Sequence, residues 1–225
     1  MTNIPWSDIL PAAVAVALSP VPITSVILAL FSQNPKRNGL AFLAGWVAGL
    51  LALTALLLFV IDFSRTSFAD QWTSLVAIVK MWLGVIFFVL AAAQWRRRPS
   101  AGEERPLPAW TAKLEAISAG QTLLVAIGLC VINPKNLVLT LAVILALGEA
   151  GVPAGQAVLG LAVYIGLGSL TIAVPVLYRV GAGAQADANL AEVKQWLQAR
   201  STTVIAVVFL LLGTLLFGKG LEGIL

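Results

Sequence analysis

Histidine is absent from this 225-residue sequence, and cysteine occurs once, as Cys130 inside an apolar run. A single cysteine excludes an internal disulfide and a CxxC thiol relay. Transition-metal sites are normally built from histidine, cysteine or clustered carboxylates, so a metal transporter is disfavoured. Because no base accompanies the cysteine, the sequence contains no recognisable catalytic set. We therefore expect neither an enzyme nor a bound cofactor.

Charged residues are also scarce, at 11% of the chain, against roughly 25% in soluble domains. The acidic residues all fall in predicted loops or at predicted helix ends: Asp8, Asp62, Asp70, Glu103, Glu104, Glu115, Glu149, Asp187, Glu192 and Glu222. No buried acid is therefore predicted that would select a cationic substrate. Asp8 and Glu149 are candidates for carrying protons, but solvation at a helix end is the favoured interpretation.

Apolar residues make up 60% of the chain and recur in runs of roughly 18 or more, the length of a membrane span. The net charge of +4 does not indicate a nucleic-acid partner, because the basic residues cluster between these runs, as membrane orientation signals do. We expect one all-α membrane domain over residues 1–225. The predicted helices are Asp8–Phe31, Gly39–Ile61, Leu75–Trp95, Ser118–Leu147, Ala154–Tyr178 and Thr203–Gly218.

The basic residues are distributed unevenly between the two predicted faces of the membrane. One face would carry Lys36, Arg37, Arg96, Arg97, Arg98, Arg105, Lys113, Arg179, Lys194 and Arg200. The other would carry Arg65 and Lys219, with Lys80 just inside the third helix. Cytoplasmic loops are rich in Lys and Arg. We therefore place the first face in the cytoplasm and both termini outside the plasma membrane.

Two polar connectors lie on the predicted cytoplasmic face. Residues 96–117 are expected to link the two halves, and their first part, Arg96–Pro108, is rich in charge, proline and glycine, which indicates a flexible linker. Ala186–Arg200 places Leu190, Val193 and Trp196 at helical spacing, which predicts an amphipathic helix on the membrane interface.

The six predicted helices divide into two halves, residues 1–95 and 118–225. Three is an odd number, so a duplicated three-helix unit inserts its second copy upside down, as in many transporters. A matched pair of proline interruptions supports this plan: Pro20 and Pro22 break the first helix of one half, and Pro134 breaks the first helix of the other. Proline removes a backbone donor and frees carbonyls on the preceding turn, and such backbone is tolerated only against protein or a cavity.

Lys135 lies beside the second interruption, near the predicted membrane centre. A lysine there costs roughly 3 kcal/mol on insertion scales, so it should face the protein interior. Its candidate partners are freed carbonyls, the polar side chains of Asn133, Asn136, Ser19 and Thr24, or an anionic ligand drawn to the half-helix N-termini. The alternative is that both interruptions are structural kinks. The candidate substrate-binding residues are Ser19, Pro20, Pro22, Thr24, Asn133, Pro134, Lys135 and Asn136.

Glycines mark expected sites of close helix packing. Gly45 and Gly49 form a GxxxG motif, and Gly160, Gly166 and Gly168 lie in the fifth predicted helix. Such residues bring helices together within a chain or in a homodimer. The intramolecular interpretation is favoured, because opposed halves must pack tightly.

Two segments carry a family resemblance. Ala17–Leu50 (ALSPVPITSVILALFSQNPKRNGLAFLAGWVAGL) and Val131–Val143 (VINPKNLVLTLAV) resemble the actinobacterial GAP proteins, also called Sap or sulfolipid-addressing proteins, of the LysE exporter superfamily. The resemblance implies a six-helix exporter of glycolipids or their precursors. It also implies that the functional residues are Ser19, Pro20 and Pro22 in the first motif and Asn133, Pro134 and Lys135 in the second. Ser19 and Val21 replace glycines frequent in LysE-type motifs, which disfavours close backbone approach to an amino-acid substrate.

Three functions follow as hypotheses. The leading one is a transporter that moves an anionic lipid or glycolipid across the plasma membrane, with Lys135 holding the headgroup and the acyl chains in the bilayer. The second is an exporter of a small soluble metabolite such as an amino acid. The third is a non-transporting scaffold for envelope-lipid synthesis machinery.

Overall fold

The computed structural model describes residues 4–67, 72–96 and 118–223, and every secondary-structure element in this part of the chain is a helix. The predicted linker, residues 96–117, lies outside the described residues except for Arg96. Eight α-helices and one short 3₁₀-helix follow in order: α1 (Trp6–Ala17), α2 (Pro20–Leu30), α3 (Pro35–Ser67), α4 (Trp72–Arg96), α5 (Ala119–Val131), α6 (Pro134–Glu149), α7 (Ala154–Ala182), η3 (Gly183–Gln185) and α8 (Ala186–Glu222).

The two proline interruptions are present as predicted. Ser19 is extended (φ −104°, ψ 103°) and Pro20 starts α2, so α1 and α2 meet at a bend of 50°. Asn133 (φ −71°, ψ 111°) and Pro134 likewise separate α5 from α6, which meet at 63°. A proline in the first helical position needs no N–H partner. Each proline therefore starts a new half-helix instead of continuing the old one.

Three helices are long and apolar enough to cross a membrane: α3, α4 and α7. If each bent pair, α1–α2 and α5–α6, is one further span, the described residues hold up to five. The sixth predicted helix differs in form. Residues 186–222 form one continuous helix, α8, so the predicted amphipathic segment and the last apolar run are not separate elements. Nothing in Ala186–Gly218 forces a break, because this stretch contains no proline.

Glycines set the close contacts between helices. A Cβ on Gly45 would collide with the carbonyl of Leu123, and one on Gly49 would lie 2.7 Å from the Cβ of Cys130, so α3 packs along α5. In the same way Gly160 approaches Ile9, and Gly168 approaches Val16 at 3.1 Å, which packs α7 along α1. The prediction of intramolecular glycine packing is confirmed at these positions. A Cβ on Gly166 would meet open space.

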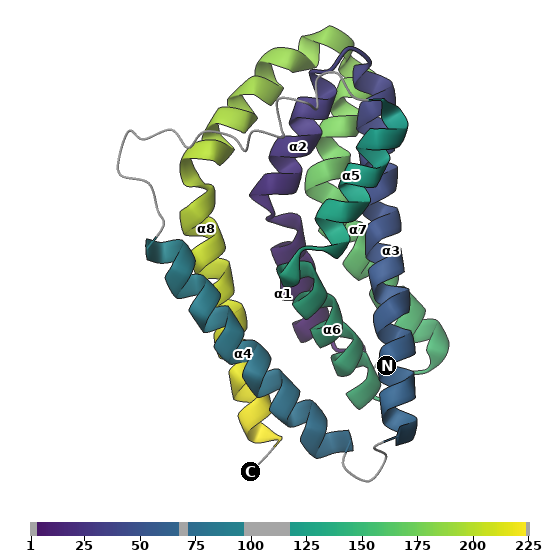
Figure 1. Cartoon of the computed structure of the whole chain (residues 1–225), viewed down its shortest axis with the longest axis vertical. Helices are drawn as coiled ribbons and strands as arrows, with labels where there is room; N and C mark the ends of the chain where they lie inside the picture. Colours follow the sequence, from purple (N-terminus) through teal and green to yellow (C-terminus); the bar gives the residue numbers. More distant parts are fainter. Residues whose placement is uncertain (1–3, 68–71, 97–117, 224–225) are drawn as a thin grey trace.

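The third long pair, α4 and α8, is antiparallel. Gly84 lies against Phe217, and Gly220 against Met81, so sequence numbers rise along one helix as they fall along the other. Ring contacts between Phe87 and Phe209, with centroids 5.4 Å apart, add to this interface. Figure 1 shows α4 and α8 running together along one side of the bundle.

The helices of the two halves run in opposite directions. Figure 1 shows α1–α2 rising where α5–α6 descends, α3 descending where α7 rises, and α4 rising where α8 descends. One end of the bundle therefore holds the start of α1 and the ends of α6 and α8 (Figure 1). We call it the Asp8 end. The starts of α3 and α5 and the end of α7 lie at the opposite end.

Two ion pairs occupy the Asp8 end. Asp8 accepts hydrogen bonds from Nζ of Lys219 at 2.6 Å through both oxygens, and Glu149 pairs with Lys80. The prediction of simple solvation at a helix end is therefore wrong for Asp8, whose side chain is 12% exposed, whereas Glu149 is paired but keeps 43% of its side chain exposed. Each acid instead has a lysine partner from the opposite half of the sequence, which sequence spacing alone does not reveal.

Candidate functional site

The first interruption leaves backbone carbonyls of α1 without their helical donors. Pro20 has no N–H to offer the carbonyl of Val16, the acceptor four residues earlier in a regular helix. The N–H of Ser19 turns to the carbonyl of Ala17 instead of Ala15. The carbonyls of Ala15 and Val16 therefore require another donor in the protein interior.

Lys135 supplies that donor from the other half of the chain. Its Nζ donates to the carbonyl of Ala15 at 2.5 Å and to that of Val16 at 3.4 Å, and the residue is only 6% exposed. Its position also suits the charge, because the C-terminal end of a helix carries partial negative charge. No carboxylate lies within ion-pair distance of Lys135 in the described part of the chain. The ammonium is therefore compensated by dipoles only.

At the interruption between α5 and α6, the freed backbone carbonyl also receives a hydrogen bond from a side chain. Pro134 has no N–H for the carbonyl of Cys130, and Nδ2 of Asn136 donates to that carbonyl at 3.1 Å. Asn133 caps α6 by accepting the N–H of Lys135 at 3.0 Å. In both halves, a carbonyl freed by a proline four residues later is thus bonded by a polar side chain of α6.

Further polar side chains extend this arrangement into α7. Thr171 donates to the carbonyl of Ala17 at 2.6 Å. Thr140 donates to the carbonyl of Asn136 at 2.7 Å, so its hydroxyl proton is engaged, and the Tyr164 hydroxyl 2.9 Å away must donate to Thr140. Sequence reasoning missed these three residues. The available signal was a hydroxyl group in the middle of an apolar helix.

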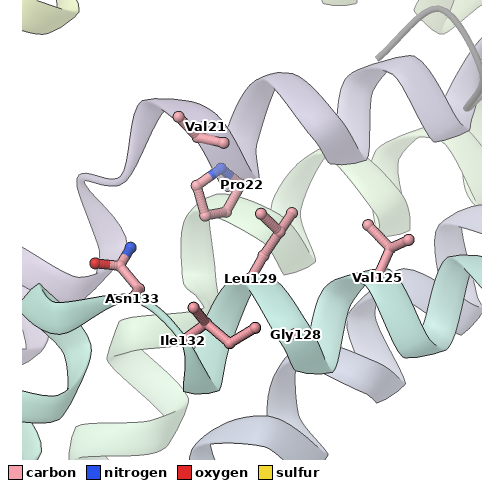
Figure 2. Close-up of a pocket in the computed structure, with 7 residues that line it drawn as sticks. All are labelled: Val21, Pro22, Val125, Gly128, Leu129, Ile132 and Asn133. Atoms are coloured by element: carbon pink, nitrogen blue, oxygen red, sulfur yellow. The ribbon is translucent and has the colours of Figure 1, made fainter. Parts of the chain in front are cut away.

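A groove of about 530 Å³ lies where the two interruptions meet. Figure 2 shows Val21 and Pro22 of α2 facing the end of α5, where Ile132 and Asn133 lie. The complete lining is Val21, Pro22, Val125, Gly128, Leu129, Ile132 and Asn133. Ile132 is 82% exposed. The groove is therefore mostly apolar and open at the side, with the polar side chain of Asn133 at one end.

A second groove of about 440 Å³ runs between α2, α7 and the start of α8. Its lining is Leu18, Ile23, Ile27, Leu170, Thr171, Val174, Pro175, Tyr178, Asn189 and Leu190. The hydroxyl of Thr171 is bonded to α1, and Asn189 donates to the Tyr178 hydroxyl at 2.8 Å. The groove therefore presents mainly hydrocarbon. Both grooves lie on the side of the interruptions away from the Asp8 end.

The structure brings the predicted site residues of the two halves together, but it divides them by role. Ser19 is the N-cap of α2 and is buried, as is Thr24 one turn into that helix. Neither bonds Lys135, so that expectation is wrong, whereas the expected pairing of Lys135 with freed carbonyls is confirmed. Pro20 is the first residue of α2. Pro22 and Asn133 line the first groove.

Pro134 and Asn136 complete the second interruption, and Asn136 is fully buried. Its Oδ1 has no hydrogen-bond partner among the described residues. Buried polar atoms normally have partners. The interruption between α5 and α6 therefore retains one unused acceptor.

The long apolar helices and the broken pairs that meet inside the bundle define a multi-pass helical membrane protein. A family model described as "SfLAP: Sap, sulfolipid-1-addressing protein" matches residues 9–222. The chain belongs to this family, so the resemblance of Ala17–Leu50 and Val131–Val143 to Sap proteins is confirmed. Comparisons with curated proteins and with solved structures find no match.

Proposed function

We propose that the protein moves an anionic lipid or glycolipid, or a precursor of one, across the plasma membrane. Membership of the Sap family, whose name refers to sulfolipid-1 addressing, supports a lipid substrate. The observation that carries the proposal is the buried ammonium of Lys135, held by the carbonyls of Ala15 and Val16 without a carboxylate nearby in the described residues. Because dipoles alone compensate this charge, it attracts an anion.

The proposal includes six membrane spans in two inverted three-helix halves. Corresponding helices run in opposite directions (Figure 1). The packing is also reciprocal, because the broken helix of each half lies against the second helix of the other: α1 along α7, and α5 along α3. A site at the interface of the two halves is the usual plan of transporters with inverted repeats.

The orientation follows from charge. Lys36, Arg37 and Arg179 lie at the end opposite Asp8. Lys80 and Lys219 at the Asp8 end are each paired with an acid, so that end presents less net positive charge. By the positive-inside rule, the Asp8 end is extracytoplasmic, as are both termini.

In this orientation the first groove opens toward the cytoplasmic leaflet. The headgroup of a lipid would enter between α2 and α5, where Asn133 provides a polar contact, while its chains remain in the bilayer beside the exposed Ile132 and Val21. An anionic oxygen that reaches the interruption competes with the carbonyls of Ala15 and Val16 for Nζ of Lys135. Such an exchange would loosen α1 from α6. A laterally open groove favours a lipid over a soluble metabolite.

The experiment is lipid translocation in proteoliposomes, with a fluorescent anionic lipid and an impermeant quencher. Lys135→Ala should reduce the initial rate at least tenfold. Lys36→Ala is the matched control, because Asn34-Pro35-Lys36 repeats the tripeptide Asn133-Pro134-Lys135 at an exposed helix start. A folded Lys135→Ala protein with the wild-type rate would refute the proposal, and rapid transport by the purified protein would exclude a non-transporting scaffold.

A further inference from the structure

The two ion pairs of the Asp8 end join the same two parts of the molecule. Lys219 of α8 binds Asp8 of α1 at 2.6 Å, and Lys80 of α4 binds Glu149 of α6. Each pair therefore connects the α4–α8 unit to one of the broken helices. Each also connects the first half of the sequence to the second.

The α4–α8 unit is internally well packed. A Cβ on Gly84 would lie 2.7 Å from the Cβ of Phe217, and one on Gly220 would lie 2.6 Å from the backbone nitrogen of Met81. Backbones this close, together with the Phe87–Phe209 contact, favour movement of the two helices as one body. The described charged residues that tie this body to α1 and α6 are the two lysines and their acids.

Each pair joins one buried side chain to one partly exposed side chain. The side chains of Lys80 and Asp8 are 7% and 12% exposed, whereas those of their partners Glu149 and Lys219 are 43% and 35% exposed. Partly buried pairs are less screened by salt than exposed ones. Neutralising Glu149 leaves the buried Lys80 as an unpaired charge, and neutralising Asp8 removes the bond that holds Lys219 to α1; both changes favour separation of the helices and entry of water.

The ends of the molecule differ in a way that suits a gate. Both grooves lie on the opposite side of the interruptions from these pairs. At the Asp8 end, the residues of α1 one turn beyond the first pair are closed off, since Ala12 is 3% exposed and Ala13 fully buried. The two grooves therefore lie between the interruptions and the end opposite Asp8, whereas the Asp8 end is closed and holds the two ion pairs.

We infer that Asp8–Lys219 and Lys80–Glu149 form the outer gate of the transport path, closing the α4–α8 unit onto α1 and α6. This inference rests on the proposed function, because a gate requires a transport path. A substrate would leave past Asp8 when both ion pairs open. Asp8, Lys80, Glu149 and Lys219 are positioning residues, because they act through helix movement and need no contact with the substrate.

The test measures water access behind the gate with a reporter cysteine. Ala12→Cys places a thiol one turn beyond Asp8, and a membrane-impermeant maleimide is added from the extracytoplasmic side of sealed vesicles. The fully buried native Cys130 stays in place, and its labelling is measured in the chain without a reporter. Asp8→Asn and Glu149→Gln together should raise the labelling rate at Ala12→Cys about tenfold, as the loss of two partly exposed pairs implies.

Two controls separate a gate from general loosening. Ala29→Cys lies fully buried in α2 beyond the first interruption, and its labelling should stay unchanged in the same double variant. Asp8→Lys with Lys219→Asp reverses the first pair and leaves the second pair intact, so Ala12→Cys in this background should be labelled at about the wild-type rate.

Equal increases at both reporters would mean that the pairs only stabilise the fold, and no increase at Ala12→Cys would mean that they do not hold this end closed. Either result overturns the gate. Because labelling does not require transport, failure of the gate leaves the Lys135→Ala translocation test intact. Failure of that translocation test would in turn leave the labelling result intact.

Discussion

At the scale of single residues, the site depends on carbonyls that prolines leave free. Lys135 bonds the carbonyls of Ala15 and Val16, and Asn136 bonds that of Cys130. An unpaired carbonyl in the bilayer interior costs several kcal/mol. The polar side chains of α6 therefore contribute to folding as well as to any ligand site. This double role explains how a cation remains inside a mostly apolar bundle.

Thr171→Val tests the contribution of one such bond. The substitution keeps the side-chain shape but removes the donor to the carbonyl of Ala17, which lies 2.6 Å away. We expect a loss of about 1 kcal/mol of stability, measured as a lower midpoint of thermal unfolding in detergent. Thr214→Val is the control, because the Thr214 hydroxyl bonds only its own helix, at the carbonyl of Leu210. Equal midpoints for the two variants would contradict this account of α1.

Tyr164→Phe tests the hydroxyl chain that reaches the second interruption. Tyr164 is fully buried, and its hydroxyl donates to Thr140. Loss of this donor should cost about 1 kcal/mol by the same unfolding measurement. Tyr178→Phe, at the partly exposed end of α7, should change stability less. The opposite order of the two effects would show that the Thr140 contact does not contribute.

Part of this residue-level arrangement was predictable from the sequence. A lysine beside a mid-membrane proline must find acceptors, and freed carbonyls were among the expected partners of Lys135. The identity of those carbonyls was not predictable, because Ala15 and Lys135 are 120 positions apart in the chain. The same holds for Thr171 and Ala17, and for the lysine partners of Asp8 and Glu149. Spacing within one helix carries no information on which helix lies opposite.

At the scale of elements, prolines and glycines determine where helices end and how closely they approach. The breaks at Ser19–Pro20 and Asn133–Pro134 follow from local chemistry, since proline cannot donate and its predecessor avoids the helical region. For this reason they were predicted correctly. The continuity of α8 was not, because a polar segment that precedes an apolar one remains helical whenever no residue breaks it.

Gly45→Ala tests the close packing of α3 on α5. The added methyl group would overlap the carbonyl of Leu123, which belongs to a helix backbone and cannot rotate away. We expect destabilisation by about 1–3 kcal/mol, seen as a lower unfolding midpoint. Gly166→Ala is the control, because its methyl group would meet nothing within 4 Å and alanine favours helix. A Gly45→Ala protein as stable as the control would show that α3 and α5 lie further apart.

At the scale of the whole molecule, the helices of one half run opposite to those of the other (Figure 1). Broken helices of opposite direction bring the C-terminal end of α1 to the N-terminal end of α6, where Lys135 lies. The sequence suggested this plan through matched prolines, although the halves share little direct identity. The α4–α8 pair completes the bundle, and two ion pairs connect it to α1 and α6 at the Asp8 end.

The measurement that tests the central claim most directly is photocrosslinking with an anionic lipid that carries a photoreactive group in its headgroup. In membranes, the wild-type protein should crosslink mainly at residues of the first groove near the interruptions, around Pro22 and Asn133. Lys135→Ala should remove most of this product, Lys36→Ala should not, and a zwitterionic lipid with the same group should give little. The contrary result is crosslinking spread evenly over exposed membrane-facing positions such as Phe59 and Val89 and unchanged by Lys135→Ala. That outcome would show that Lys135 only stabilises the broken helices and does not bind an anionic lipid.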